Sequence, residues 1–274
     1  MLEWLLSGVN WSYMALAFSA VLVEALWGLH LTHSPVPSVR ERGYSLIWES
    51  LEGFTFGALL LLSIAVFEGP ILGWVKGVDV ATAERMWAEA QQRLSDYLLS
   101  IALLERDLSL TVVFSSLAGT VGASSILARF MAQYLLFFST AMLFLTYIVK
   151  GYGSLMFSIG IALASVRRVR SIGSYLVFSV IAIVVASCSL APFVYNSLQS
   201  LRFSYKPGII DVLSEAFKQL FTDRLRDLIE DGKLLSYIAT VATVAVAVIT
   251  AVAAALSRAS GGLMDTLMSR VRGL

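Results

Sequence analysis

Charged side chains are scarce in this sequence, and their scarcity excludes a soluble domain. Lysine, arginine, aspartate and glutamate make up 14% of the 274 residues, whereas hydrophobic residues make up 58% and the mean hydropathy is +0.79. A soluble domain carries roughly 25% charged residues. The formal net charge is only +1, so any cationic surface must come from local clustering. The composition predicts a polytopic membrane protein.

Cysteine and histidine are nearly absent, which excludes several kinds of site. The single cysteine, Cys188, cannot form an internal disulfide. The two histidines, His30 and His33, have no cysteine near them in the sequence and do not indicate a zinc site. Residues 119–122 lack the Lys-Ser/Thr pair that a phosphate-binding loop requires. We therefore expect no catalytic residues, no metal and no cofactor, and we expect the chain not to be an enzyme.

Basic residues are also missing from the N-terminal segment. No lysine or arginine precedes the first apolar run, and no small-residue cleavage pattern accompanies it. A cleaved signal peptide has both features. The first apolar segment is therefore expected to remain in the mature protein.

Long apolar runs are abundant. A hydrocarbon core of ~30 Å needs about 20 apolar residues in a helix. Seven segments approach or reach this length, which predicts an all-α, polytopic transmembrane helical bundle of about seven spans. Only Lys150 and Gly151 separate the fourth and fifth segments, so these two could form one kinked or re-entrant unit and reduce the number to six. The segments are residues 11–31, 54–75, 108–128, 130–149, 152–166, 171–195 and 235–257.

The arginines predict the orientation of these spans. If the N-terminus lies outside, the arginines near span ends fall in cytoplasmic segments, and the short external turn contains only Lys150. Basic residues close to span ends favour the cytoplasmic side. We therefore predict a multi-pass protein of the cytoplasmic membrane with its N-terminus outside and a cytoplasmic tail at residues 258–274.

Two long external segments, residues 76–107 and 196–234, are predicted to contain amphipathic helices within a single transmembrane domain of residues 1–274. In residues 209–230, apolar side chains recur at three- and four-residue spacings with charges between them. Residues 82–104 show a weaker version of the pattern. Such helices could cap a cavity or only anchor the bundle at the outer interface.

Two acids, Glu24 and Glu68, lie in otherwise apolar segments. An ionisable group at membrane depth costs ~3 kcal/mol or more unless it faces a partner or water. Each is a candidate functional acid, and the alternative is that each lies near a helix end and reaches headgroup water. Gly69, Pro70 and Gly73 follow Glu68 and predict a kink or a close helix contact.

The most informative feature is a cluster of three arginines, Arg167, Arg168 and Arg170, between two apolar runs. So short a break predicts a tight turn at the cytoplasmic face. The arginines are candidate contacts for the phosphates of DNA, and the alternative is that they set topology and bind anionic lipid.

The sequence around this turn resembles a known family. Residues 160–163 (Gly-Ile-Ala-Leu) precede the arginines, Ile172-Gly173 follows them, and a long apolar helix then leads to residues 191–195 with Pro192. Over residues 155–199 this pattern resembles the polytopic inner-membrane channel subunits of type IV secretion machines, and among them the CedA-type DNA-import proteins of crenarchaea. Gly173 and Pro192 are then expected to serve packing or kinking at the span ends.

The resemblance implies an archaeal channel component through which single-stranded DNA crosses the membrane into the cell. It also implies a separate ATPase, small pilin-like membrane subunits and an oligomeric assembly as partners. Two other functions stay open. A small-solute secondary transporter would contain inverted repeats with discontinuous helices, and a membrane scaffold of a pilus or secretion machine would need a larger cytoplasmic surface than the sequence provides.

Overall fold

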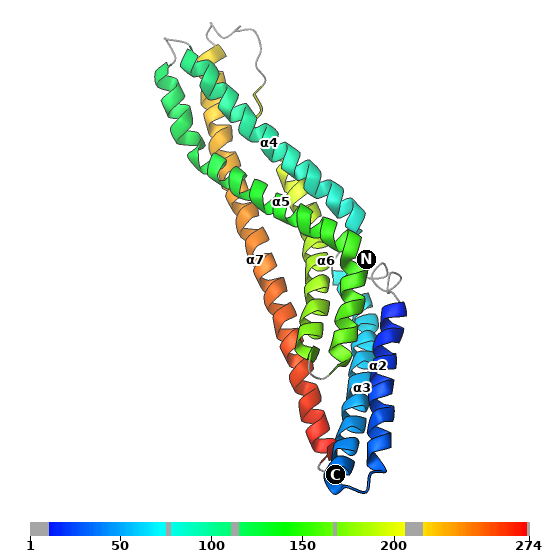
Figure 1. Ribbon diagram of the computed structural model, residues 1–274. Helices are drawn as coiled ribbons and strands as arrows, with labels where there is room; N and C mark the ends of the chain where they lie inside the picture. Colours follow the sequence, from blue (N-terminus) through cyan, green and yellow to red (C-terminus); the bar gives the residue numbers. More distant parts are fainter. Residues whose placement is uncertain (1–10, 75–77, 111–114, 167–168, 206–215, 273–274) are drawn as a thin grey trace. The chain divides into compact units, whose positions relative to one another are not determined.

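The computed structural model describes residues 11–74, 78–110, 115–166, 169–205 and 216–272 (Figure 1). The side chains of residues 11, 13, 14, 16, 17, 61–74, 110, 115–117, 216–222 and 260–272 lie outside the described part. The described residues form helices and no strand, which confirms the all-α class. The helices are α2 (Trp11–Thr32), α3 (Pro37–Trp74), α4 (Val80–Leu110), α5 (Ser115–Ser165), α6 (Arg170–Leu198) and α7 (Ala216–Arg272).

Three helices in the described part of the chain are long and apolar enough to cross a membrane. They comprise Ala118–Ser165 of α5, Arg170–Leu198 of α6 and Asp223–Ala259 of α7. A shorter apolar stretch, Phe18–Thr32, lies in α2. Three such helices fit a membrane location, but they do not support seven spans. Most of the predicted second span, in α3, has side chains outside the described part.

The predicted third, fourth and fifth spans fall on one helix, α5, apart from residues 108–114 and 166. Arg129, Lys150 and Gly151, which were expected to mark span ends, all lie inside it. The helix continues because one glycine costs only about 1 kcal/mol relative to alanine, and α5 contains no proline to remove a backbone hydrogen bond. The 51 residues of α5 correspond to about 77 Å of straight helix, more than twice the ~30 Å hydrocarbon core.

The predicted amphipathic helix at 209–230 and the last predicted span are also continuous. Both belong to the 57-residue helix α7, apart from residues 209–215, which lie outside the described part. Gly232 lies at the junction of these two predicted segments, and the helix continues through it. Its missing side chain lets α7 pack closely against α5. A Cβ at Gly232 would lie 3.3 Å from the backbone nitrogen of Ala128.

The chain divides into two compact units. Unit 1 comprises residues 1–77, 148–186 and 247–274, and unit 2 comprises residues 78–147 and 187–246. The helices α5, α6 and α7 each contribute residues to both units.

Unit 1 contains an antiparallel hairpin of α2 and α3. Pro37 is the first residue of α3, where its missing N–H and fixed φ suit a helix start. Two glycines let the helices approach closely, since a Cβ at Gly43 would lie 2.7 Å from the carbonyl oxygen of Gly28. Gly28 and Gly43 therefore lie at the same level along the hairpin.

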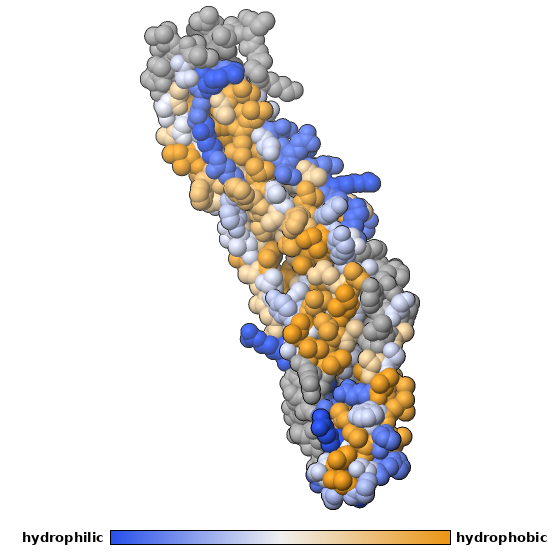
Figure 2. Space-filling view, viewed as in Figure 1, coloured by the Kyte–Doolittle hydropathy of each residue, from blue (hydrophilic) through white to orange (hydrophobic). Residues whose placement is uncertain are grey.

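Unit 2 contains α4, an amphipathic helix in the first predicted external segment. Asp79 caps its start by accepting a hydrogen bond from the backbone N–H of Thr82 at 3.3 Å. The interaction of Asp79 with the Thr82 side chain, and then this backbone contact, lower the pKa of Asp79. One face is buried at alternating three- and four-residue spacings, and hydrophilic residues cover the opposite face (Figure 2). The buried residues are Val80, Ala83, Trp87, Ala90, Leu94, Tyr97, Ile101, Leu104 and Leu108.

Candidate functional site

The arginine turn between α5 and α6 is the first candidate site, and the structure describes one of its three arginines. Arg167 and Arg168 lie outside the described residues. Arg170 is the first residue of α6, and its side chain is only 6% exposed. Its Nη1 donates to Oε1 of Glu52 on α3 at 2.5 Å, and Glu52 is 2% exposed. Arg170 therefore forms a buried ion pair and does not present its charge at the surface.

Aromatic and backbone contacts hold this ion pair in place. The guanidinium carbon of Arg170 lies 4.9 Å from the ring centroid of Phe56, a geometry that favours a cation over the aromatic face. Gly53 and Gly57 form a small-xxx-small pattern on α3 that lets the end of α5 approach. A Cβ at Gly53 would collide with the carbonyl oxygen of Ser165, and a Cβ at Gly57 with its hydroxyl.

The two helices that lead into the turn are packed against each other through a second pair of glycines. A Cβ at Gly160 of α5 would lie 2.7 Å from the Val177 side chain and 3.1 Å from the carbonyl oxygen of Gly173. A Cβ at Gly173 of α6 would collide with the backbone of Leu163 and Ala164. Gly173 therefore lies at a close helix contact, as its expected packing role requires.

Several polar atoms at the start of α6 have no hydrogen-bond partner among the described residues. They are Nε and Nη2 of Arg170 and Oγ of Ser174, one turn further along α6. Buried polar groups in proteins are nearly always satisfied by protein or by ordered water. These atoms are therefore buried polar groups at the start of α6, where the helices otherwise pack through apolar contacts.

The other residues predicted as functional are not brought to this site by any described contact. Glu24 lies on α2 and is half-buried. Glu68, Gly69, Pro70 and Gly73 lie on α3, where the side chains are outside the described part. Pro192 lies inside α6, which continues to Leu198. No group of three or more metal-ligating side chains occurs among the described residues.

The partner of Arg170, Glu52, was missed by the sequence reasoning, as were Gly53 and Gly57. A signal for them exists in the sequence. Glu52 lies two residues before the apolar run that begins at Phe54. The two glycines, four residues apart, lie just before this run and near its start. An acid at the edge of one apolar segment and a base at the edge of another are candidate partners, because a buried charge needs an opposite charge.

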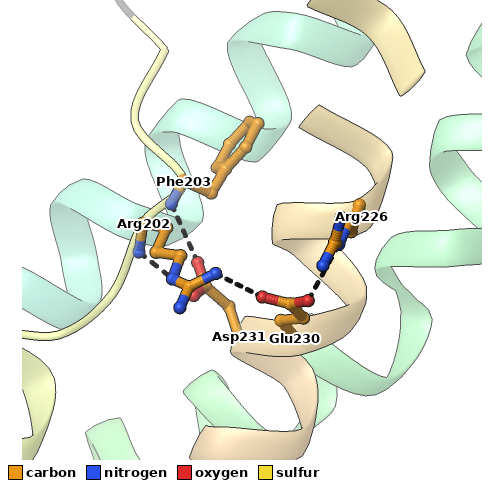
Figure 3. A network of polar contacts seen from close by, with 5 residues as sticks. All are labelled: Arg202, Phe203, Arg226, Glu230 and Asp231. Carbon is orange, nitrogen blue, oxygen red and sulfur yellow. Dashed lines mark hydrogen bonds and ion pairs between the residues drawn. The ribbon is translucent and has the colours of Figure 1, made fainter. Parts of the chain in front are cut away.

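A second polar cluster lies in unit 2, where the segment that follows α6 is tied to α7 (Figure 3). The carboxylate of Asp231, a residue that is 2% exposed, accepts hydrogen bonds from the backbone N–H groups of Arg202 and Phe203 at 3.1 and 2.9 Å. Glu230 pairs with Arg202 at 2.5 Å and with Arg226 at 3.0 Å. These bonds replace the helical partners that the backbone of residues 202 and 203 lacks.

The same segment is also tied to α4. The hydroxyl of Tyr205 donates to Asp107 at 2.8 Å, and Arg106 pairs with the same carboxylate at 2.9 Å. The hydrogen bonds from Arg106 and Tyr205 lower the pKa of Asp107. The Tyr97 ring meets Phe203 edge-on with centroids 6.0 Å apart, and burial raises the pKa of its phenol. These contacts link residues 202–205 to α4 and α7 within unit 2.

A third group of polar side chains links α4, α5 and α6 inside unit 2. The indole N–H of Trp87 donates to the hydroxyl of Ser187 at 3.1 Å, and that hydroxyl also contacts the hydroxyl of Thr146 at 2.5 Å. All three residues are buried. These hydrogen bonds satisfy the buried polar groups where the three helices pack together.

No known protein family, no curated protein and no solved structure matches this chain.

Proposed function

We propose that this chain is a multi-pass subunit of the cytoplasmic membrane that takes part in importing DNA, in the manner of type IV secretion channel subunits. The residues that carry the resemblance, 155–199, comprise the end of α5, the turn that follows it, and α6. The observation that carries the proposal is the anchoring of this turn to α3 by the buried Arg170–Glu52 pair and by the contacts of Gly53 and Gly57. A turn held in this way can keep a fixed position beside a passage.

The apolar outer face of α7 supports an assembly within the membrane. Val244, Val248, Val252 and Leu256 recur every four residues, and each is about half exposed or more. Monomeric soluble proteins rarely expose contiguous apolar patches of this kind. Lipid or further subunits would cover this face, which agrees with an oligomer accompanied by small pilin-like membrane subunits. A separate ATPase would drive transport.

The proposed topology has the N-terminus outside and the tail inside. Cysteine labelling of whole cells should reach cysteines introduced at exposed positions of the 199–202 segment and should miss cysteines in residues 258–274, because the arginines near span ends favour the cytoplasmic side. The native Cys188 is 0% exposed and serves as an internal negative control. Labelling of the tail from outside intact cells would contradict this orientation.

The DNA cargo is tested by deleting the gene and measuring transfer of a chromosomal marker from neighbouring cells. We expect transfer to fall to the background of a strain that lacks donors, with growth and uptake of labelled amino acids and sugars unchanged. Re-expression of the wild-type chain should restore transfer. Normal DNA transfer in the deletion strain, together with loss of uptake of one small solute, would favour the secondary transporter over the DNA channel.

A further inference from the structure

Within unit 1, the α5–α6 turn and the α2–α3 turn lie at different levels along α3. The end of α5 packs against Gly53 through Ser165, whereas Gly28 of α2 packs against Gly43. Ten residues of α3 separate these two contacts, which corresponds to about 15 Å of helix. The α2–α3 turn lies further still, beyond Pro37. The hairpin therefore projects well past the end of α5.

In the projecting part of the hairpin, residues 19–29 and 44–51, the charged side chains are only partly exposed. The carboxyl-bearing residues in these ranges, Glu24 and Glu49, are half-buried, and Glu49 accepts a hydrogen bond from Ser45 at 3.0 Å. The exposed positions are instead mostly large and apolar. They are Ser19, Ala20, Leu22, Val23, Leu26, Trp27, Leu29, Tyr44, Ser45, Trp48 and Leu51.

The exposed residues of the hairpin change from mostly apolar to mostly hydrophilic at the level of Gly28 and Gly43. Trp27 and Tyr44 flank these glycines and are 59% and 54% exposed. On the side of the turn, the exposed residues include histidines and charges, namely His30, His33, Arg40, Glu41 and Arg42. The exposed residues are therefore mostly apolar along the hairpin and mostly hydrophilic toward its turn. Aromatic residues between an apolar band and a basic segment are typical of a membrane–water interface.

We infer that the hairpin surface between these two levels is immersed in lipid, with the membrane surface at the level of Trp27 and Tyr44. Ser165, at the end of α5, then lies about 15 Å below that surface, inside the thickness of the bilayer. This placement gives a reason for the Arg170–Glu52 pair, because a guanidinium at that depth needs a counter-charge and shielding from lipid. The inference rests on the membrane location in the proposed function and not on its DNA cargo.

Spin labels can test the inference on the full-length protein in lipid nanodiscs. In a Cys188→Ala background, single cysteines replace Val23, Leu26 or Leu51 and carry a nitroxide. Collisions with oxygen, which concentrates in lipid, are compared with collisions with a water-soluble nickel chelate. We expect oxygen collisions to exceed nickel collisions at all three positions and the order to reverse at Glu41→Cys. A label at Val21, which is 4% exposed, provides the buried control with low accessibility to both reagents.

Two outcomes would overturn the inference, and they differ from each other. High nickel accessibility at positions 23, 26 and 51 would mean that the hairpin projects into water. Low accessibility to both reagents at these positions, as at Val21, would mean that a second copy of the chain covers the surface. Neither outcome depends on DNA transfer, so failure here is distinguishable from failure of the proposed function.

Discussion

Replacing Arg170 with leucine is expected to destabilise the protein by about 3–5 kcal/mol, because the change leaves the carboxylate of Glu52 buried without its counter-charge. Glu52 is 2% exposed and lies in a helix contact formed by Gly53, Gly57 and Ser165. Water cannot reach the carboxylate without separating α3 from the α5–α6 turn. The expected result is a large fall in the thermal unfolding temperature of the purified protein in detergent.

The double variant Glu52→Leu/Arg170→Leu distinguishes two contributions to the free energy of unfolding. One is the penalty for a buried unpaired charge, and the other is the net stabilisation by the ion pair. Removing both charges should recover most of the lost stability, since apolar replacements of buried ion pairs are often neutral or stabilising. A matched control is the exposed pair of Arg226 and Glu230, in which Arg226 is 75% exposed. Arg226→Gln should leave the thermal unfolding temperature nearly unchanged, because solvent screens an exposed ion pair. An Arg170→Leu variant as stable as this control would contradict the buried ion pair.

Gly173→Ala is expected to have the second large effect. The added methyl group would collide with the backbone of Leu163 and Ala164 and would lie 2.5 Å from the carbonyl oxygen of Gly160. Backbone cannot move aside as a flexible side chain can, so α5 and α6 must separate. Overpacking of this kind costs typically 1–3 kcal/mol, and we expect the upper end of that range.

Gly151→Ala on α5 is the matched control for Gly173→Ala. Nothing lies within 4 Å of a Cβ at Gly151, so alanine there should stabilise the helix by about 0.5–1 kcal/mol through its better helix propensity. Opposite signs for the same substitution, measured by thermal unfolding in detergent, are the expected result. Equal effects of the two variants would show that the close contact between α5 and α6 is not formed.

The helical character of this chain and much of its membrane character could be predicted from the sequence. Apolar runs of membrane length leave a helix as the only way to satisfy the backbone, and α5, α6 and α7 follow from this rule. The amphipathic pattern in residues 82–104 also identified α4, and it predicted one apolar face with Met86, Ala90, Leu94, Tyr97 and Leu98. The buried face instead includes Trp87 and Ile101 and leaves Met86 half-buried. Local periodicity finds a helix better than it finds the centre of its buried face.

The number and limits of the helices could not be predicted as well. Arg129 and Lys150 were interpreted as span boundaries because charges avoid the hydrocarbon core, but both lie inside α5. Charge opposes burial in lipid without opposing a helical backbone, so it marks membrane depth and not a helix end. Glu105 of α4 pairs with Arg129, and the sequence contains no sign of this pairing because the two residues are distant along the chain.

The sequence by itself determined that this protein is helical, that several of its helices suit a membrane, and that arginines gather at the turn between α5 and α6. These properties depend on composition and on short-range periodicity. Only the tertiary structure decided that Arg170 is buried against Glu52 and that Gly53, Gly57, Gly160 and Gly173 bring the helices together at that turn. The physical reason is that exposure and charge pairing depend on which helices meet, and residues 52 and 170 are separated by more than one hundred positions in the chain.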